Sequence, residues 1–191
     1  MRLFIGVELS TGVRDGAVVI ADDLRDQFSR SAPTAVLRWV GPENLHITLW
    51  FLGEIDDGRA SALQAALAVP LSTKAFDLHA RGAGMFPPSG PPRALWIGLT
   101  DGATSLVAVY NELTPRLVNL GFEPERRAYA PHLTIARFKD IARKDIAVAR
   151  QIATRCTSDA GSCRIEAVTL FRSQLSPKGS RYEALLRVPL S

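Results

Sequence analysis

The sequence has few of the residues that build metal centres or covalent cross-links. Its 191 residues include two cysteines, Cys156 and Cys163, and three histidines. A protein zinc site uses several such ligands, commonly in closely spaced pairs, and these two cysteines do not match that pattern. The chain is therefore not a disulfide-rich scaffold, and no metal or other cofactor is expected. The simplest interpretation of the cysteines is two reduced thiols in a cytoplasmic protein.

Long hydrophobic runs are also absent. No apolar stretch approaches the roughly 20 residues that a transmembrane helix needs, and the N-terminal residues 1–5 run into an apparent strand rather than a signal peptide. Hydrophobic residues make up 47% of the chain and charged residues 22%, which is ordinary for a folded domain. We therefore expect no membrane partner, a cytoplasmic location and a monomer.

Acidic residues are slightly outnumbered by basic ones. Lysine and arginine total 23 against 19 aspartate and glutamate residues, which gives a net charge of +4. A basic surface suits an anionic ligand such as nucleic acid, although many basic proteins bind none. The charge is consistent with a nucleic-acid partner and does not require one.

Two of the three histidines open nearly identical tetrads. Residues 46–49 read His-Ile-Thr-Leu and residues 132–135 read His-Leu-Thr-Ile, each within an apolar, strand-like run. Successive side chains of a strand point to opposite faces, so each histidine shares a face with the threonine two residues later. The sequence thus presents an imidazole beside a hydroxyl twice, as two proton-transfer groups with two hydrogen-bond donors.

The third histidine serves as an internal control. His79 lies between Asp77 and Arg81 in a strand-like segment, where alternation places it among solvated charges. We interpret it as a surface histidine without a role in chemistry.

Hydrophobic periodicity predicts the same order of elements in each half of the chain. That order is strand, helix, tetrad strand, helix, strand, and a proline-rich segment at 86–92 separates the halves. The repeat predicts an α+β fold with duplicated β-α-β-α-β halves, forming a single domain over 1–191 with lobes at about 1–85 and 93–191. Each lobe would carry one His-Thr pair on a wall of a shared groove.

The individual elements follow from local patterns. Ser10 is the expected cap of a helix that buries five apolar residues from Val13 to Phe28, and Gly121 is expected to end a helix in the second half. Further expected elements include strands at 36–40 and 165–171, a helix at about 141–154, a turn at 177–179 and a last strand at 182–188.

Five segments carry a resemblance to a known family. In chain order they read RLFIGVEL, NLHITLWFLGE, LWIGL, APHLTIARF and LFRSQLSPKGSRYEALLRVPL. With its two HxTx motifs, the chain resembles the 2H phosphoesterase superfamily and, within it, the RNA 2′,3′-cyclic phosphodiesterases, also described as 2′-5′ RNA ligase-like. The resemblance covers nearly the full length. It implies a bilobal fold in which two antiparallel-rich sheets line a central cleft, with helices outside.

The same resemblance implies an activity and residue roles. The activity is metal-independent hydrolysis of a 2′,3′-cyclic phosphate at an RNA end to a 2′-phosphomonoester, as part of RNA processing. By family correspondence, His46 is the proton donor, His132 is the proton acceptor, and Thr48 and Thr134 bind phosphate oxygens. The residue types suit this chemistry independently, because histidine titrates near neutrality and hydroxyl groups can donate to a charged oxygen.

Arg137 is the remaining candidate for phosphate binding. In the family, an arginine five residues after the second histidine is associated with the substrate phosphate. Strict alternation, however, places Arg137 on the face opposite His132. A β-bulge or the end of the strand would have to turn it toward the groove; otherwise it is a surface residue.

Several aromatic and basic residues are weaker candidates for contacts with RNA. Trp50 shares the His46 face by alternation, so it is expected to line the cleft or fill its floor. The other candidates for base stacking or backbone contact, each with a structural alternative, are Trp39, Trp96, Phe86, Tyr182, Arg126 and Arg127.

Two other functions stay open at this point. One is a 2H esterase for another cyclic or 2′-5′ nucleotide phosphate. The other is a non-catalytic module that binds RNA ends. A pure binding module has no need of two imidazoles, so the paired histidines favour an enzyme.

Overall fold

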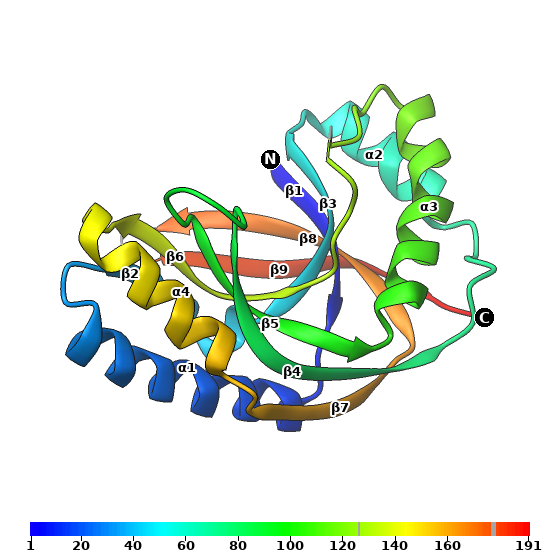
Figure 1. Cartoon of the computed structure of the whole chain (residues 1–191). Helices are drawn as coiled ribbons and strands as arrows, with labels where there is room; N and C mark the ends of the chain where they lie inside the picture. Colours follow the sequence, from blue (N-terminus) through cyan, green and yellow to red (C-terminus); the bar gives the residue numbers. More distant parts are fainter. Residues whose placement is uncertain (126, 177–178) are drawn as a thin grey trace.

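The computed structural model describes residues 1–125, 127–176 and 179–191 and shows a mixed α+β fold (Figure 1). Two antiparallel sheets are flanked by helices, which confirms the predicted fold class. Arg126 and most of the expected turn at 177–179 lie outside the described residues.

In the part of the chain that the structure describes, the first sheet has four strands and the second has five. In spatial order, the first sheet contains β3 (His46–Glu54), β1 (Arg2–Glu8), β8 (Ala167–Ser176) and β9 (Gly179–Pro189). The second contains β2 (Val36–Trp39), β6 (Leu133–Asp140), β5 (Ala94–Asp101), β4 (Phe76–Phe86) and β7 (Asp159–Ile165). Every neighbouring pair of strands is antiparallel.

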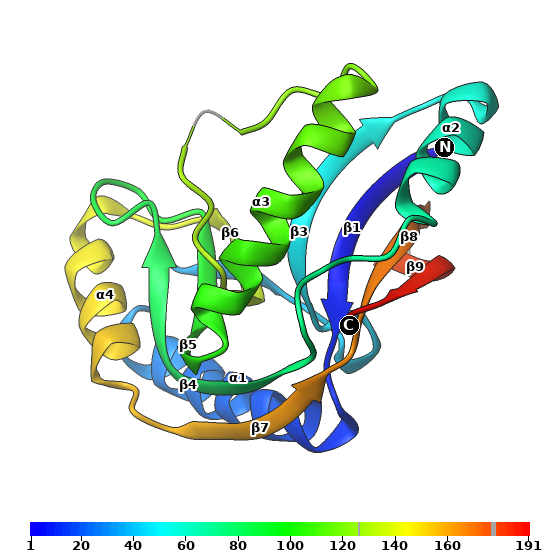
Figure 2. The same cartoon turned by 90° about the vertical axis from the view of Figure 1, so that its right-hand side faces the viewer.

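Within the described residues, the helices α1 to α4 lie outside the sheets (Figures 1 and 2). The helices α1 (Thr11–Ser31) and α4 (Ile146–Arg155) pack against the second sheet, at β7 and β4 respectively. The helix α3 (Ala103–Asn119) contacts β3 and β5, and α2 (Asp57–Leu67) packs against α3. Within the described part of the chain, no helix combines the length and apolar character needed to cross a membrane.

The helix ends form as their sequences predict. The side chain of Ser10 accepts a hydrogen bond from the Val13 backbone N–H, and α1 buries five residues at helical spacing from Val13 to Phe28. Gly121 follows α3 at a φ of 78°, a left-handed conformation that glycine adopts without strain, and its N–H donates to the Val118 carbonyl. The expected helix at 141–154 starts later, because residues 143–145 form a 3₁₀ turn before α4.

Each half of the chain contributes strands to the sheet of the other half. In the first sheet, β1 lies between β3 of its own half and β8 of the second half; in the second sheet, β5 lies between β6 of its own half and β4 of the first half. The sets β3-β1-β8 and β6-β5-β4 therefore correspond. The division into lobes at about 1–85 and 93–191 stays a prediction. In the structure, the short connection at 87–93 makes β4, which lies in the first of these segments, a hairpin partner of β5, which lies in the second.

One strand differs from the expected pattern. In place of a single strand over 165–171, the chain forms β7 up to Ile165 and then β8 from Ala167. The strand β7 lies at the edge of the second sheet beside β4 and is rich in polar and small residues. It therefore lacks the apolar alternation by which a strand is recognised.

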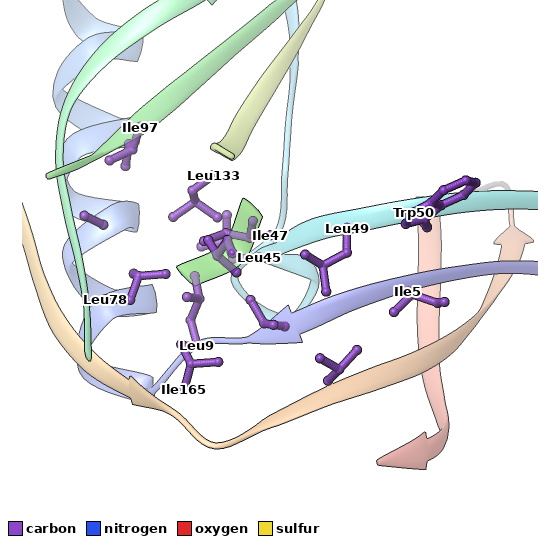
Figure 3. Close-up of a cluster of buried hydrophobic side chains, with 14 of the residues drawn as sticks. Ile5, Leu9, Leu45, Ile47, Leu49, Trp50, Leu78, Ile97, Leu133 and Ile165 are labelled. Carbon is purple, nitrogen blue, oxygen red and sulfur yellow. The ribbon is translucent and has the colours of Figure 1, made fainter. Parts of the chain in front are cut away.

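The apolar residues of both tetrads are buried in a common core. Ile47 and Leu133 are fully buried and belong to one hydrophobic cluster with Leu45, Leu78 and Ile97 (Figure 3). Because alternate side chains of a strand face opposite ways, burial of these residues turns the histidines and threonines of the tetrads away from the core. The core thereby fixes which way the candidate site faces.

Candidate active site

A cavity of about 650 Å³ is lined by residues of both sheets. His46 and Thr48 line it from β3 of the first sheet. Thr134 lines it from β6 of the second sheet, and His132 lines it from the position just before β6. The two tetrads thus open onto the same space, as the repeated motif predicts. The cavity has the size of a pocket for a small ligand or for the end of a larger one.

Each tetrad strand contains a β-bulge at the same place. Between β1 and β3 the register passes from Gly6 opposite Thr48 to Ile5 opposite Trp50, which leaves Leu49 as an extra residue. Between β5 and β6 it passes from Trp96 opposite Thr134 to Leu95 opposite Ala136, which leaves Ile135 as an extra residue. An extra residue in one strand shifts the alternation of all that follow.

The bulge in β6 turns Arg137 toward the cavity. Ile135 and Ala136 are both buried, and Arg137, the next residue, is exposed and lines the cavity. Of the two alternatives that the sequence left open, a bulge is the one that the structure shows. Arg137 therefore lies in the same cavity as the two histidines.

The bulge in β3 buries Trp50 and turns Phe51 toward the cavity. Trp50 is only 3% exposed and does not line the cavity. Its ring stacks at 5.4 Å on Tyr110, which does line the cavity, so of its two expected positions the floor of the cleft is the one that fits. Phe51 lines the cavity instead and is 53% exposed, although sequence alternation does not make it a candidate. Phe51 occupies the position in β3 that Arg137 occupies in β6.

His46 is held in one tautomer by the segment that precedes its strand. Its Nδ1 lies 2.7 Å from the carbonyl oxygen of Asn44, and since a carbonyl only accepts, Nδ1 carries a proton and donates. Its Nε2 lies 3.0 Å from the Thr48 hydroxyl. A Cβ on Gly6, opposite on β1, would lie 2.7 Å from the Ile47 carbonyl oxygen, so only glycine fits beside this motif.

His132 repeats this arrangement. Its Nδ1 donates to the carbonyl oxygen of Ala130 at 2.7 Å, again two residues earlier in the chain. In neutral form both histidines therefore keep a lone pair on Nε2, available for a proton. Two imidazoles in the same tautomer line one cavity.

Aromatic rings pack against both imidazoles. Tyr182 packs edge-on against His46 with ring centroids 5.1 Å apart, and Phe86 packs edge-on against His132 at 4.9 Å. Phe4 lies 4.7 Å from the His46 ring. Tyr182 and Phe86, which the sequence offered as base-stacking candidates, line the cavity and also fix the orientation of the two histidines.

The pKa values of both histidines are lowered from 6.5. Burial is the largest cause for His46 and for His132, because it disfavours the charged imidazolium. The hydrogen bond to a backbone carbonyl raises each pKa in part, and the positive charge of Arg137 lowers both. Burial therefore favours the neutral form of both imidazoles in the free protein, and an anion bound between them would raise both pKa values.

Tyr129 links the two walls of the cavity. Its hydroxyl donates to the Thr48 carbonyl oxygen at 3.0 Å, and its ring stacks on Tyr110 at 4.6 Å. Burial raises the pKa of Tyr129, so the phenol keeps its proton and remains a donor. Sequence reasoning missed this residue, because a contact across 81 positions leaves no local pattern.

Other candidates lie outside the cavity. His79 is half-buried on β4, with its Nε2 2.8 Å from a carboxylate oxygen of Asp159, and it does not line the cavity. Trp39 lies under the guanidinium of Arg25, and Trp96 packs beside Phe86. Cys156 and Cys163 are free thiols. The residues that the structure describes contain no group of three histidine, cysteine or acidic side chains placed to hold a metal ion.

Comparison with known proteins agrees with the duplicated architecture. The family model described as LigT like Phosphoesterase matches this chain twice, over residues 15–96 and 97–182. A protein of Methanothermobacter thermautotrophicus named RNA 2′,3′-cyclic phosphodiesterase is 34% identical over 183 residues, which covers 95% of each chain. A protein of the same name from Methanocaldococcus jannaschii is 32% identical and covers 97% of this chain and 98% of its own.

Solved structures show the same fold. TT0787 of Thermus thermophilus is 28% identical with a TM-score of 0.75, and the match covers 100% of this chain and 98% of that chain. Escherichia coli LigT complexed with 3′-AMP has a TM-score of 0.76 at 24% identity, over 100% and 98% of the two chains. With a family match across both halves and relatives over 30% identical along nearly the whole length, this chain belongs to the LigT-like phosphoesterase family.

Proposed function

We propose that this protein is an RNA 2′,3′-cyclic phosphodiesterase in which His46 is the general acid and His132 the general base. The observation that carries the proposal is a pair of imidazoles that open onto one cavity, each with its Nδ1 donating to the backbone carbonyl two residues earlier. Thr48 and Thr134 line the same cavity. Its full-length relatives with this name support hydrolysis over pure binding. Action as a single-domain monomer in the cytoplasm stays a prediction from the sequence.

The reaction follows from the placement of these groups. The cyclic phosphate binds between the two tetrads, and the hydroxyls of Thr48 and Thr134 and the guanidinium of Arg137 donate to its non-bridging oxygens. The Nε2 of His132 takes a proton from water as the water oxygen attacks phosphorus. The P–O3′ bond breaks, and the proton on Nε2 of His46 passes to O3′. The products are a 2′-phosphomonoester and a free 3′-hydroxyl.

A direct experiment tests the product. The purified protein is incubated with an oligonucleotide that ends in a 2′,3′-cyclic phosphate, in the presence of EDTA, and phosphorus NMR reads the position of the phosphate. The proposal predicts a 2′-phosphate at an undiminished rate. Formation of a 3′-phosphate, or activity that EDTA abolishes and one divalent metal restores, would overturn it.

The pH dependence of the reaction should differ between free and bound protein. Activity requires a protonated His46 and a neutral His132, and the fraction of each changes through its own pKa. Both pKa values lie below 6.5 in the free protein, so kcat/KM should be bell-shaped with a maximum below about pH 6.5. The bound phosphate anion raises both pKa values, so the kcat profile should lie at higher pH. Both profiles are measured on one cyclic substrate; a kcat/KM that rises steadily through pH 8 would contradict this account.

Phe51 is proposed as the surface on which the terminal base stacks. Its ring is 53% exposed within the cavity, whereas the neighbouring aromatic Trp50 is buried. Base–aromatic stacking contributes about 1–3 kcal/mol. The substitution Phe51→Ala should therefore raise KM roughly tenfold and leave kcat within a few-fold of wild type, while Phe51→Trp should keep a low KM. Steady-state kinetics decide this point, and a loss confined to kcat would assign Phe51 a different role.

A further inference from the structure

A second hollow adjoins the catalytic cavity. It has a volume of about 200 Å³ and is lined by Pro87, Pro91, Arg93 and Arg127. Arg127 also lines the catalytic cavity, so the two spaces share a wall. We call this second space the arginine hollow.

Both walls of the arginine hollow are held in place by hydrogen bonds. On one side, the guanidinium of Arg150 on α4 donates to the carbonyl oxygens of Pro87 at 2.9 Å and Gly90 at 2.6 Å. The backbone N–H of Arg93 donates to the Phe86 carbonyl at 2.7 Å. On the other side, Tyr129 fastens the segment that carries Arg127 to β3. A site whose walls are already fixed loses little conformational entropy when it binds a ligand.

The arginine hollow is positively charged. Arg93 and Arg127 are both exposed, and none of the described residues that line the hollow is acidic. Within the described part of the chain, neither guanidinium takes part in an ion pair. Two neighbouring guanidinium groups without a carboxylate are a typical arrangement for binding phosphate, because each presents donors in a planar fork.

We propose that the arginine hollow is a second phosphate subsite, which binds the phosphodiester on the 5′ side of the terminal nucleotide. The proposal rests on the proposed function, since a cyclic phosphate held by His46 and His132 fixes the 3′ end of the chain. The next anionic group along an RNA strand is then the phosphodiester on the 5′ oxygen of the same nucleoside. A cyclic mononucleotide with a free 5′-hydroxyl lacks this group, so the hollow selects RNA ends over small cyclic nucleotides.

Kinetics on two matched substrates test the subsite. The first is adenosine 2′,3′-cyclic phosphate, and the second is the dinucleotide ApA with the same cyclic end. The wild-type protein should prefer the dinucleotide in kcat/KM by a factor on the order of ten, the usual scale of a hydrogen bond to a charged group. The preference should fall as salt is raised. Arg93→Gln and Arg127→Gln should each reduce this ratio, whereas Arg155→Gln, on the distant end of α4, should leave it unchanged.

A change in the substrate completes the test without depending on any variant. In a dinucleotide whose internal linkage is a neutral methylphosphonate, the wild-type preference should vanish, and Arg93→Gln should no longer have an effect. A preference that survives both the neutral linkage and Arg93→Gln would overturn the proposal, because it would come from contacts with the second nucleoside.

Equilibrium binding separates this proposal from the proposed function. The affinity of the protein for the two dinucleotides is measured by calorimetry. Low temperature and short measurement times limit hydrolysis, so that binding is measured whether or not the protein turns the substrate over. Tighter binding of the phosphodiester than of the methylphosphonate, lost in Arg93→Gln, supports the subsite even if no hydrolysis is seen. Equal affinity for the two linkages in the wild-type protein would overturn the subsite even if both are hydrolysed.

Discussion

Replacing either tetrad histidine with alanine is expected to reduce kcat by at least about a hundredfold. A positioned general acid or base typically contributes a factor of about 10²–10⁴, and His46 and His132 each supply one such group to the cavity. His79→Ala should remain near wild type, because that ring contacts Asp159 at the edge of the second sheet, outside the cavity. Turnover of a 2′,3′-cyclic substrate is measured for all three variants.

The double variant gives a further check on the histidine pair. Groups that act as a unit in one step are not additive, so loss of both histidines should cost less than the product of the two single losses. Thermal unfolding of each variant controls for folding. An effect of His79→Ala as large as that of His46→Ala would require the site to be placed elsewhere.

The second large effect is expected at Arg137. A hydrogen bond to a charged group contributes about 1.5–3 kcal/mol, so Arg137→Gln should lower kcat/KM by roughly 10- to 150-fold. Arg137→Lys should recover part of this loss, because lysine keeps the charge without the planar fork of donors. Kinetics of the two variants on the same cyclic substrate give the comparison.

The same substitution should shift the pH profile. The charge of Arg137 lowers the pKa values of His46 and His132, so its removal should raise both and move the kcat/KM maximum to higher pH. A purely structural role for Arg137 would lower activity without this upward shift. A wild-type kcat/KM in Arg137→Gln would instead mean that Arg137 is a surface residue without a role in phosphate binding, as strict alternation implied.

Local patterns were sufficient to predict much of the fold. The cap at Ser10 and the buried face of α1 depend only on residues within that helix, and both are confirmed. The shared face of His46 and Thr48 depends on an interval of two residues, over which a strand keeps its alternation. These features could be predicted because each depends on residues close together in the sequence.

The bulges depend on partners far along the chain. Leu49 and Ile135 become extra residues only when β3 pairs with β1 and β6 pairs with β5. The run Leu49-Trp50-Phe51 is apolar at every position and so breaks the alternation, but this does not reveal which ring faces the cavity. For this reason, the sequence did not predict that Phe51 rather than Trp50 lines the cavity, and it left undecided whether Arg137 faces the cavity or the surface.

The contribution of strands to the sheet of the other half has the same long-range origin. The repeated order of elements predicts two equivalent halves, and the family model indeed matches each half once. Nothing in that order says whether β4 pairs with β1 or with β5. The short connection before Arg93 favours the hairpin with β5, which places β4 of the first half in the second sheet.

The assignment of acid and base is tested most directly by a substrate with sulfur in place of the 3′ bridging oxygen. A thiolate is a far better leaving group than an alkoxide, because a thiol has a pKa of about 8.5 and so needs no general acid. On this substrate His46→Ala should recover to near the wild-type kcat, while His132→Ala should stay at least about a hundredfold below it. Recovery of His132→Ala in place of His46→Ala, or an equal loss in both, would contradict the proposed roles.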